Sequence, residues 1–198
     1  MYIRPLVKQI LTILTAVILH LSVSNIVSTT PDEAAESFLK GIKSQNEQVM
    51  EKYMDSAYIN FVCNVQGDKD VVKRMKDALF RNFSYDIIEV GEKNDVAVAK
   101  VAVKCNDFSN VKADYDTASY KYITDNLYSD DIGDKDALNA ECLDIYVQQI
   151  EKAANREASL ETVVYIPMAD DGYYGWNLLL SDEVMKILLG GLEIPGQQ

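Results

Sequence analysis

Side chains that commonly perform acid–base or nucleophilic chemistry are scarce in this sequence of 198 residues. The one histidine, His20, lies in an apolar stretch near the N-terminus, so the remainder of the chain contains none. Ser-His-Asp and Cys-His catalytic sites and histidine-based zinc sites are thereby excluded from that remainder. A glycine-rich phosphate loop and a dinucleotide-binding fingerprint are also absent from the sequence. Acid–base chemistry would have to use carboxylates, tyrosine or lysine, and we predict no catalytic residue and no cofactor.

Acidic side chains cluster in residues 107–144, which raises the possibility of a cation site. The segment holds ten acids and three lysines, a net charge of 3 − 10 = −7. A calcium-binding EF-hand loop needs oxygen ligands at positions 1, 3 and 5 before its glycine. Counting back from Gly133 places Tyr128, Asp130 and Ile132 there, so the match fails. We interpret the segment as a solvated acidic helical hairpin and predict no metal site.

The three cysteines, Cys63, Cys105 and Cys142, are spaced 42 and 37 residues apart. These spacings fit no Cys-x-x-Cys metal or redox motif. We favour the interpretation that all three are small buried hydrophobic residues. The alternative is a single disulfide, for which Cys63–Cys105 is the preferred pair.

Aromatic residues near the C-terminus are the candidates for lining a pocket. Tyr165 alternates with Val164 and Ile166 along one predicted strand, and Tyr174 and Trp176 share a face of the next. A sheet face with tyrosine and tryptophan can line a ligand pocket. Aromatic residues at strand spacing also occur as ordinary core, and both interpretations of Tyr165, Tyr174 and Trp176 stay open.

Hydrophobic periodicity indicates the elements that must position these residues. Thr30-Pro31-Asp32-Glu33 predicts a helix start with an N-cap and a proline in the first turn, and Asp68 is expected to cap a later helix. Residues 85–92 with 96–105, and 159–169 with 173–180, are typical of two β-hairpins. Two amphipathic helices lie between them, and the inward residues of the first are expected to be Val111, Tyr115, Ala118, Tyr122, Ile123 and Leu127.

Strands joined by hairpins form an antiparallel sheet, and helices must cover at least one of its faces. We therefore predict an α+β fold with a sheet of about four strands packed on N-terminal helices. The helical hairpin is inserted between the two strand pairs. Residues 29–194 contain no linker-like tract and are expected to form a single domain.

Charge excludes two classes of partner. The chain has 19 basic and 31 acidic side chains, and without its first 30 residues it loses Arg4 and Lys8 but no acid, leaving 17 − 31 = −14. A nucleic-acid-binding protein needs a basic face to replace counterions around phosphates. Attachment to anionic lipid by surface charge is likewise unfavourable. We therefore expect no nucleic-acid partner.

The N-terminus has the layout of an export signal. Arg4 and Lys8 precede an apolar stretch, residues 10–23, and Ser22 and Ser24 supply small residues at a cleavage site. We predict that residues 1–28 are a signal peptide. The alternative is an uncleaved anchor formed by residues 10–27, which would be the chain's only contact with a membrane. Either way the protein is expected to be secreted or extracytoplasmic.

Two segments carry a resemblance to a known family. The opening residues 30–46 through Tyr53-Met54, and the closing Tyr165-Ile-Pro-Met with Gly172-Tyr-Tyr-Gly-Trp-Asn-Leu, resemble the secreted NTF2-like (cystatin-like) superfamily of Gram-positive bacteria. The resemblance implies a curved antiparallel sheet around a long helix, with a conical cavity. Enzymatic members place Asp, Tyr or His in that cavity, but no catalytic residue carries over to this sequence. The helical stretch from Phe108 to Arg156 departs from the family pattern.

We accordingly predict a non-enzymatic extracytoplasmic domain that binds an unknown small ligand or protein partner, or has a cell-envelope role. One alternative is an isomerase- or dehydratase-like enzyme that uses Asp and Tyr in the cavity. Another is a structural module that forms a homodimer. A buried carboxylate beside tyrosine in an open cavity would favour the enzyme. An exposed apolar sheet face would favour a partner or a dimer.

Overall fold

The computed structural model describes residues 30–156, 159–173 and 175–195. The predicted signal peptide or anchor lies outside them. From residue 30 to residue 106 the described chain forms α2 (Pro31–Lys43), α3 (Glu47–Met50), η1 (Glu51–Tyr53), α4 (Ala57–Asn64), α5 (Lys69–Phe80), β1 (Ser84–Lys93) and β2 (Val96–Asn106). The C-terminal half contains α6 (Val111–Asp125), α7 (Asp130–Gly133), α8 (Lys135–Ala154), β3 (Ser159–Asp170), β4 (Trp176–Leu178) and α9 (Asp182–Leu188).

Side-chain caps fix the starts of the helices that surround the core. Thr30 Oγ1 accepts a hydrogen bond from the Glu33 amide at 3.2 Å, with Pro31 in the first turn. Asp68 Oδ1 accepts from the amides of Asp70 and Val71 at 2.8 and 3.3 Å. Both caps were predicted, and both are confirmed.

The strands form one antiparallel sheet in the order β1-β2-β3-β4. Each neighbouring pair is antiparallel. Asn94, with φ of 56°, allows the tight turn between β1 and β2. Ile88 is an extra residue at a β-bulge in β1, because the pairing shifts register between Ile87 and Glu89.

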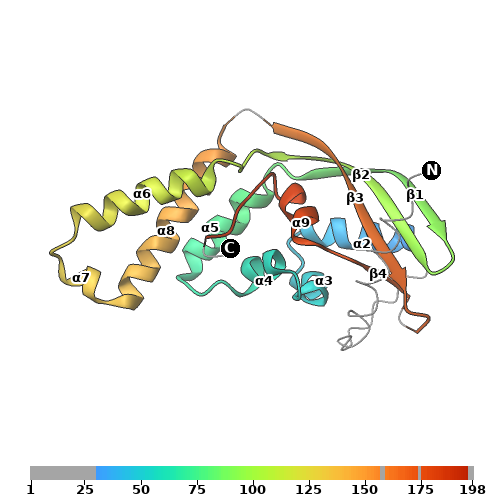
Figure 1. The fold of residues 1–198 in the computed structure, drawn as a ribbon, viewed down its shortest axis with the longest axis horizontal. Helices are drawn as coiled ribbons and strands as arrows, with labels where there is room; N and C mark the ends of the chain where they lie inside the picture. The colour runs from blue at the N-terminus through green and yellow to red at the C-terminus, as the bar shows by residue number, and fades with distance from the viewer. Residues whose placement is uncertain (1–29, 157–158, 174, 196–198) are drawn as a thin grey trace, which may run out of the picture.

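One face of the sheet packs on helices, and the core lies between these layers (Figure 1). Helix α2 contacts β1, β2 and β4, and α9 contacts β3. The buried side chains of β2 and β3 alternate with exposed ones, and those that face the helices are Ala97, Ala99, Val101, Val103, Cys105, Val164, Ile166 and Met168. The prediction of an α+β fold with an antiparallel sheet preceded by helices is confirmed.

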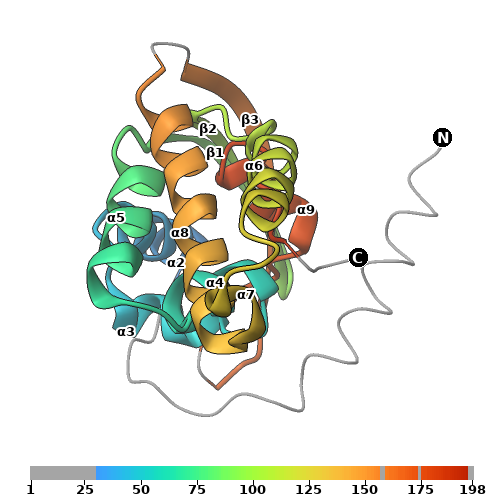
Figure 2. The same cartoon turned by 90° about the vertical axis from the view of Figure 1, so that its left-hand side faces the viewer.

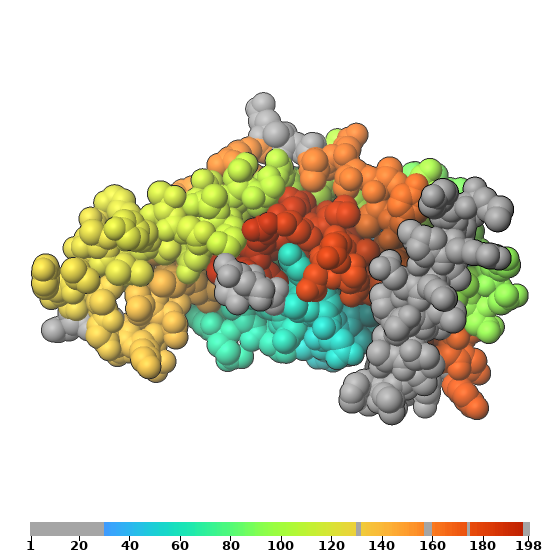
Figure 3. Space-filling view, in the orientation of Figure 1, coloured from blue at the N-terminus to red at the C-terminus, as the bar shows by residue number. Residues whose placement is uncertain are grey.

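The inserted hairpin forms a projection that we call the helical arm (residues 111–144). Helix α6 packs along α8 (Figure 2), and the arm stands out from one end of the body (Figure 3). Of the residues predicted to face inward on α6, only Val111 is buried. Ile123 and Leu127 are 37% and 54% exposed. The prediction failed there because α6 runs past the body and packs mainly on α8.

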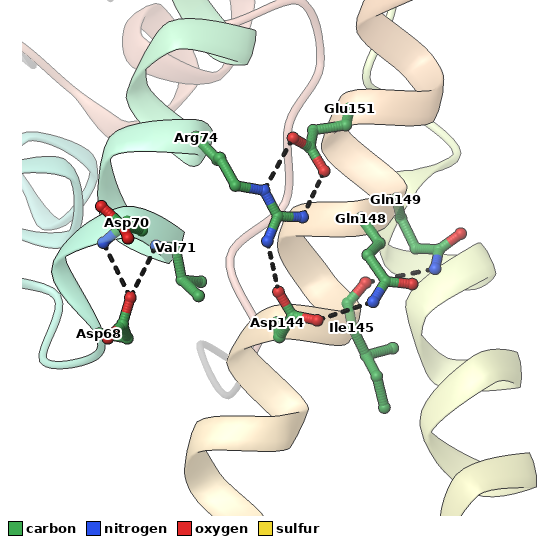
Figure 4. A network of polar contacts seen from close by, with 9 residues as sticks. All are labelled: Asp68, Asp70, Val71, Arg74, Asp144, Ile145, Gln148, Gln149 and Glu151. Atoms are coloured by element: carbon green, nitrogen blue, oxygen red, sulfur yellow. Dashed lines mark hydrogen bonds and ion pairs between the residues drawn. The ribbon is translucent and has the colours of Figure 1, made fainter.

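Arg74, on α5, bonds to two carboxylates of α8, one at its middle and one near its C-terminal end (Figure 4). Its guanidinium donates to both carboxylate oxygens of Glu151, at 3.0 and 2.6 Å, and to Asp144 Oδ1 at 2.8 Å. The Asp144 carboxylate also accepts from Gln148 at 2.7 Å. These charge-assisted bonds fix the direction in which the helical arm leaves the body.

Two further elements differ from the sequence prediction. Helix α4 was not predicted, because it is short and mostly apolar, and only Asn60 and Asn64 mark its polar side. The fourth strand covers only Trp176–Leu178 rather than residues 173–180. Gly172 and Gly175 both have positive φ, so the turn extends to residue 175.

Candidate interaction surface

The face of the sheet turned away from α2 and α9 is the candidate functional surface. On β2 it presents Val96, Val98, Lys100, Ala102 and Lys104, the residues that alternate with the buried set. Their direct partners on β3 are Ala169, Pro167, Tyr165, Val163 and Glu161. Their partners on β1 are Lys93, Gly91, Glu89, Asp86 and Ser84. Together with Ile88 of the bulge, we call this set the outer sheet face.

Much of the outer sheet face is apolar and open to solvent. Val96, Val98, Val163 and Ile88 are exposed, and Tyr165 near its centre is 58% exposed. Scattered exposed apolar residues are ordinary on protein surfaces, but these belong to adjacent strands and form a continuous patch. The continuity runs along β3 through Pro167, Tyr165 and Val163, and their partners Val98 and Ala102 extend the patch onto β2.

The charges on the outer sheet face cancel. Asp86, Glu89 and Glu161 contribute −3, and Lys93, Lys100 and Lys104 contribute +3. Lys104 Nζ lies 2.9 Å from Glu161 Oε1 across the two strands. Residues 31–198 carry −14 in total, so all of that excess lies elsewhere on the chain. The outer sheet face is a neutral, partly apolar patch on an acidic protein.

The aromatic residues proposed as pocket lining fall on different faces. Tyr165 lies on the outer sheet face. Trp176 is 7% exposed and, like Leu178, packs in the core. Tyr174 lies outside the described residues. Tyr165 and Trp176 therefore do not line a common cavity.

Two tyrosine hydroxyl groups in the interior donate hydrogen bonds to backbone carbonyl oxygens. Tyr58 and Tyr146 donate to the carbonyl oxygens of Leu192 and Glu193, at 3.0 and 2.9 Å. Burial raises the pKa of both, and it raises the pKa of Tyr53 to about 12. Through these hydrogen bonds, Tyr58 and Tyr146 fasten the C-terminal segment to the body.

Within the described residues the buried polar side chains are Ser56, Asn106 and Gln149, and none is a carboxylate. Asn106 Nδ2 donates to the carbonyl oxygen of Ala154 at 2.8 Å and so ties the end of β2 to the end of α8. A buried carboxylate beside tyrosine is the arrangement that would favour an enzyme. No such pair occurs in the described interior.

All three cysteines are free thiols in the structure. Cys105 is buried at the end of β2, and burial raises its pKa to about 11. Cys63 and Cys142 are half-buried on α4 and α8, and burial raises the pKa of Cys63. The Cys63–Cys105 disulfide that the sequence left open is not formed.

The acidic segment is helical, and some of its carboxylates have structural roles. Asp134 Oδ1 caps α8 by accepting from the amides of Asp136 and Ala137, at 2.9 and 3.2 Å. Lys112 and Lys121 each pair with the aspartate one turn further along α6. The described residues hold no group of three or more His, Cys, Asp or Glu side chains placed to bind a metal ion.

Sequence reasoning did not identify the outer sheet face. The alternation of Val96 and Val98 with Ala97 and Ala99 showed that both sides of β2 are apolar at this end. That signal could have been used, since a strand that is apolar on both faces needs a packing layer against each of them.

In the part of the chain that the structure describes, no helix is both long and apolar enough to cross a membrane.

Comparisons with known proteins give one structural similarity. No family model and no curated protein matches the sequence. A crystal structure of a Bacillus subtilis protein described as a candidate lipoprotein, YcdA, is 16% identical, with a TM-score of 0.41. The match covers 84% of this chain and 48% of YcdA, so this chain spans about half the length of that protein. At this level the similarity carries no argument about function.

Proposed function

We propose that the protein is an extracytoplasmic NTF2-like domain without enzymatic activity, which binds a protein partner through the outer sheet face. The occupant we propose for that face is a second copy of the chain. The export-like N-terminus supports the location. The observation that carries the binding role is the neutral apolar patch on an otherwise acidic surface.

Charge favours a second copy over other occupants. A basic partner would gain most by docking on the acidic parts of the chain, and the outer sheet face offers it no net attraction. Two outer sheet faces can meet without net repulsion, because each carries three acids and three lysines. A two-fold arrangement can then pair lysines of one copy with carboxylates of the other.

The size of the face predicts a weak dimer. Three strands with about nine paired residues each span about 30 Å by 14 Å, or about 400 Å² in projection. Stable interfaces bury about 800 Å² on each partner. Association should therefore be visible only in concentrated solution, and it should strengthen with salt as the acidic remainders of the two copies are screened.

Sedimentation equilibrium on Tyr165→Glu tests this proposal. The substitution places an uncompensated carboxylate at the centre of the patch, and we expect it to weaken self-association about tenfold or more. Tyr128→Glu is the matched control, because Tyr128 is 98% exposed and lies beyond the end of α6, away from the sheet. A wild-type protein that stays monomeric at all concentrations would overturn the dimer. Equal effects of the two substitutions would overturn the use of this face.

A further inference from the structure

A groove among the helices, with no strand residue in its lining, has a lining unlike the rest of the surface. It lies between α5, the turn from α2 to α3 and the connection from α4 to α5, and has a volume of about 370 Å³. That volume lies within the range of small-molecule sites. The lining residues are Gln45, Val65, Gly67, Lys69, Val72, Lys73 and Lys76.

The lining contains three cations and no acid, although acids outnumber basic residues 31 to 19 in the chain. Lys69, Lys73 and Lys76 share one side of α5 with Val72, because they lie three or four residues apart. Lys73 Nζ is 2.6 Å from Asp77, and Lys76 Nζ is 2.8 Å from Glu47. Each ammonium group has three donors, so both lysines retain capacity for a further anionic partner. An exposed ion pair such as Lys73–Asp77 contributes little free energy, so Lys73 can exchange Asp77 for another anionic partner at little cost.

Part of the lining of the groove is apolar and packs closely on α8. Val65 and Val72 provide aliphatic surface, and Gly67 exposes bare backbone. A methyl group on Gly67 would come within 2.3 Å of Leu143 Cδ2, which shows how closely this connection packs on α8. On the other wall, Gln45 has φ of 53° and donates to the carbonyl oxygen of Lys76 at 3.5 Å.

We propose that this groove binds a small amphiphilic anion, that is, a carboxylate or phosphate group attached to a short aliphatic body. The anionic group lies among the ammonium groups of Lys69, Lys73 and Lys76. The aliphatic body covers Val65 and Val72. The ligand site is separate from the outer sheet face and does not depend on the dimer.

The test is an NMR titration of the full chain with hexyl phosphate, hexanoate and hexanol, followed at the amides of Gly67 and Val72. We expect saturable shifts with at least one of the two anions and none with hexanol. Binding of hexyl phosphate alone identifies phosphate as the recognised group, and binding of hexanoate alone identifies carboxylate. Absence of saturable shifts with both anions would overturn the proposal, as would equal binding of hexanol.

A pair of variants separates the lysine cluster from general charge. Lys69→Gln combined with Lys73→Gln should weaken binding of the anion about tenfold, because charge-assisted hydrogen bonds are lost. Lys121→Gln is the matched control, since Lys121 and Lys73 are both 74% exposed and each pairs with an aspartate four residues later. Unchanged affinity in the double variant, or an equal loss in the control, would overturn the proposed site.

Discussion

At the scale of single residues, Arg74 is the side chain that links the two halves of the helical layer. It bonds Glu151 through two nitrogens and Asp144 through a third, over sequence separations of 77 and 70 residues. The alternation of charges on α5 gave no indication of this, because the partners lie on α8 and only the packing of these helices brings them together. Sequence reasoning could place Arg74 on a helix but could not assign its partners.

Arg74→Met should lower the free energy of unfolding by about 1–3 kcal/mol, because two carboxylates lose their partner while the apolar stem is kept. Lys73→Met is the control, as its pair with Asp77 is exposed and should contribute less than about 1 kcal/mol. Urea denaturation of both variants provides the comparison. Equal losses would contradict the role given to Arg74.

Arg74 should also determine part of the loss of folding stability at acidic pH. The Arg74 hydrogen bonds hold the pKa of Glu151 below its ordinary value of 4.5. A carboxylate whose pKa is lower in the folded than in the unfolded state stabilises the fold at pH values above its unfolded-state pKa. This stabilisation is lost as the pH falls through its folded-state pKa. The free energy of unfolding of Arg74→Met should therefore fall less steeply below pH 4.5 than that of the wild type. Urea titrations across this range measure the difference, and identical slopes would refute the coupling.

At the scale of elements, the order of helices and hairpins, the inserted helical hairpin included, followed from periodicity and caps, whereas the projection of the helical arm from the body did not. Apolar residues recur on α6 with helical spacing, which predicts a buried face. Ile123 and Leu127 are nevertheless exposed, because burial depends on how far the helix runs beyond the body. Helix α4 was missed for a different reason, since it has only eight residues and its polar side is marked by Asn60 and Asn64 alone.

The arm should open locally before the body unfolds. On α8 the buried residues begin at Ile145, and the part from Lys135 to Asp144 has none. Asp134→Ala removes the cap of α8 at the arm's far end, so amides in its first turns should exchange with solvent faster while global stability stays nearly constant. Asp68→Ala, which uncaps α5, should instead lower global stability by about 1 kcal/mol, because α5 buries Met75, Leu79 and Phe80. Hydrogen exchange and urea denaturation would contradict this account if both variants behaved alike.

At the scale of the whole molecule, net charge differs between regions of the surface. The sequence revealed the acidic segment of residues 107–144, but not the neutrality of the outer sheet face. The six charged residues of that face come from positions 86 to 161, and only the register of three strands brings them together. The lysine-lined groove is different, because its three lysines all lie on α5 and only Gln45 comes from a distant part of the sequence.

The most direct test of the central claim is whether the outer sheet face becomes covered as the protein is concentrated. Lysine acetylation, read by mass spectrometry, can follow Lys100 and Lys104 on that face, with Lys73 and Lys121 as exposed references elsewhere. We predict that labelling of Lys100 and Lys104 falls from dilute to concentrated protein, while that of Lys73 and Lys121 stays constant. Labelling of Lys100 and Lys104 that does not change with concentration would contradict the proposal that a second copy covers this face.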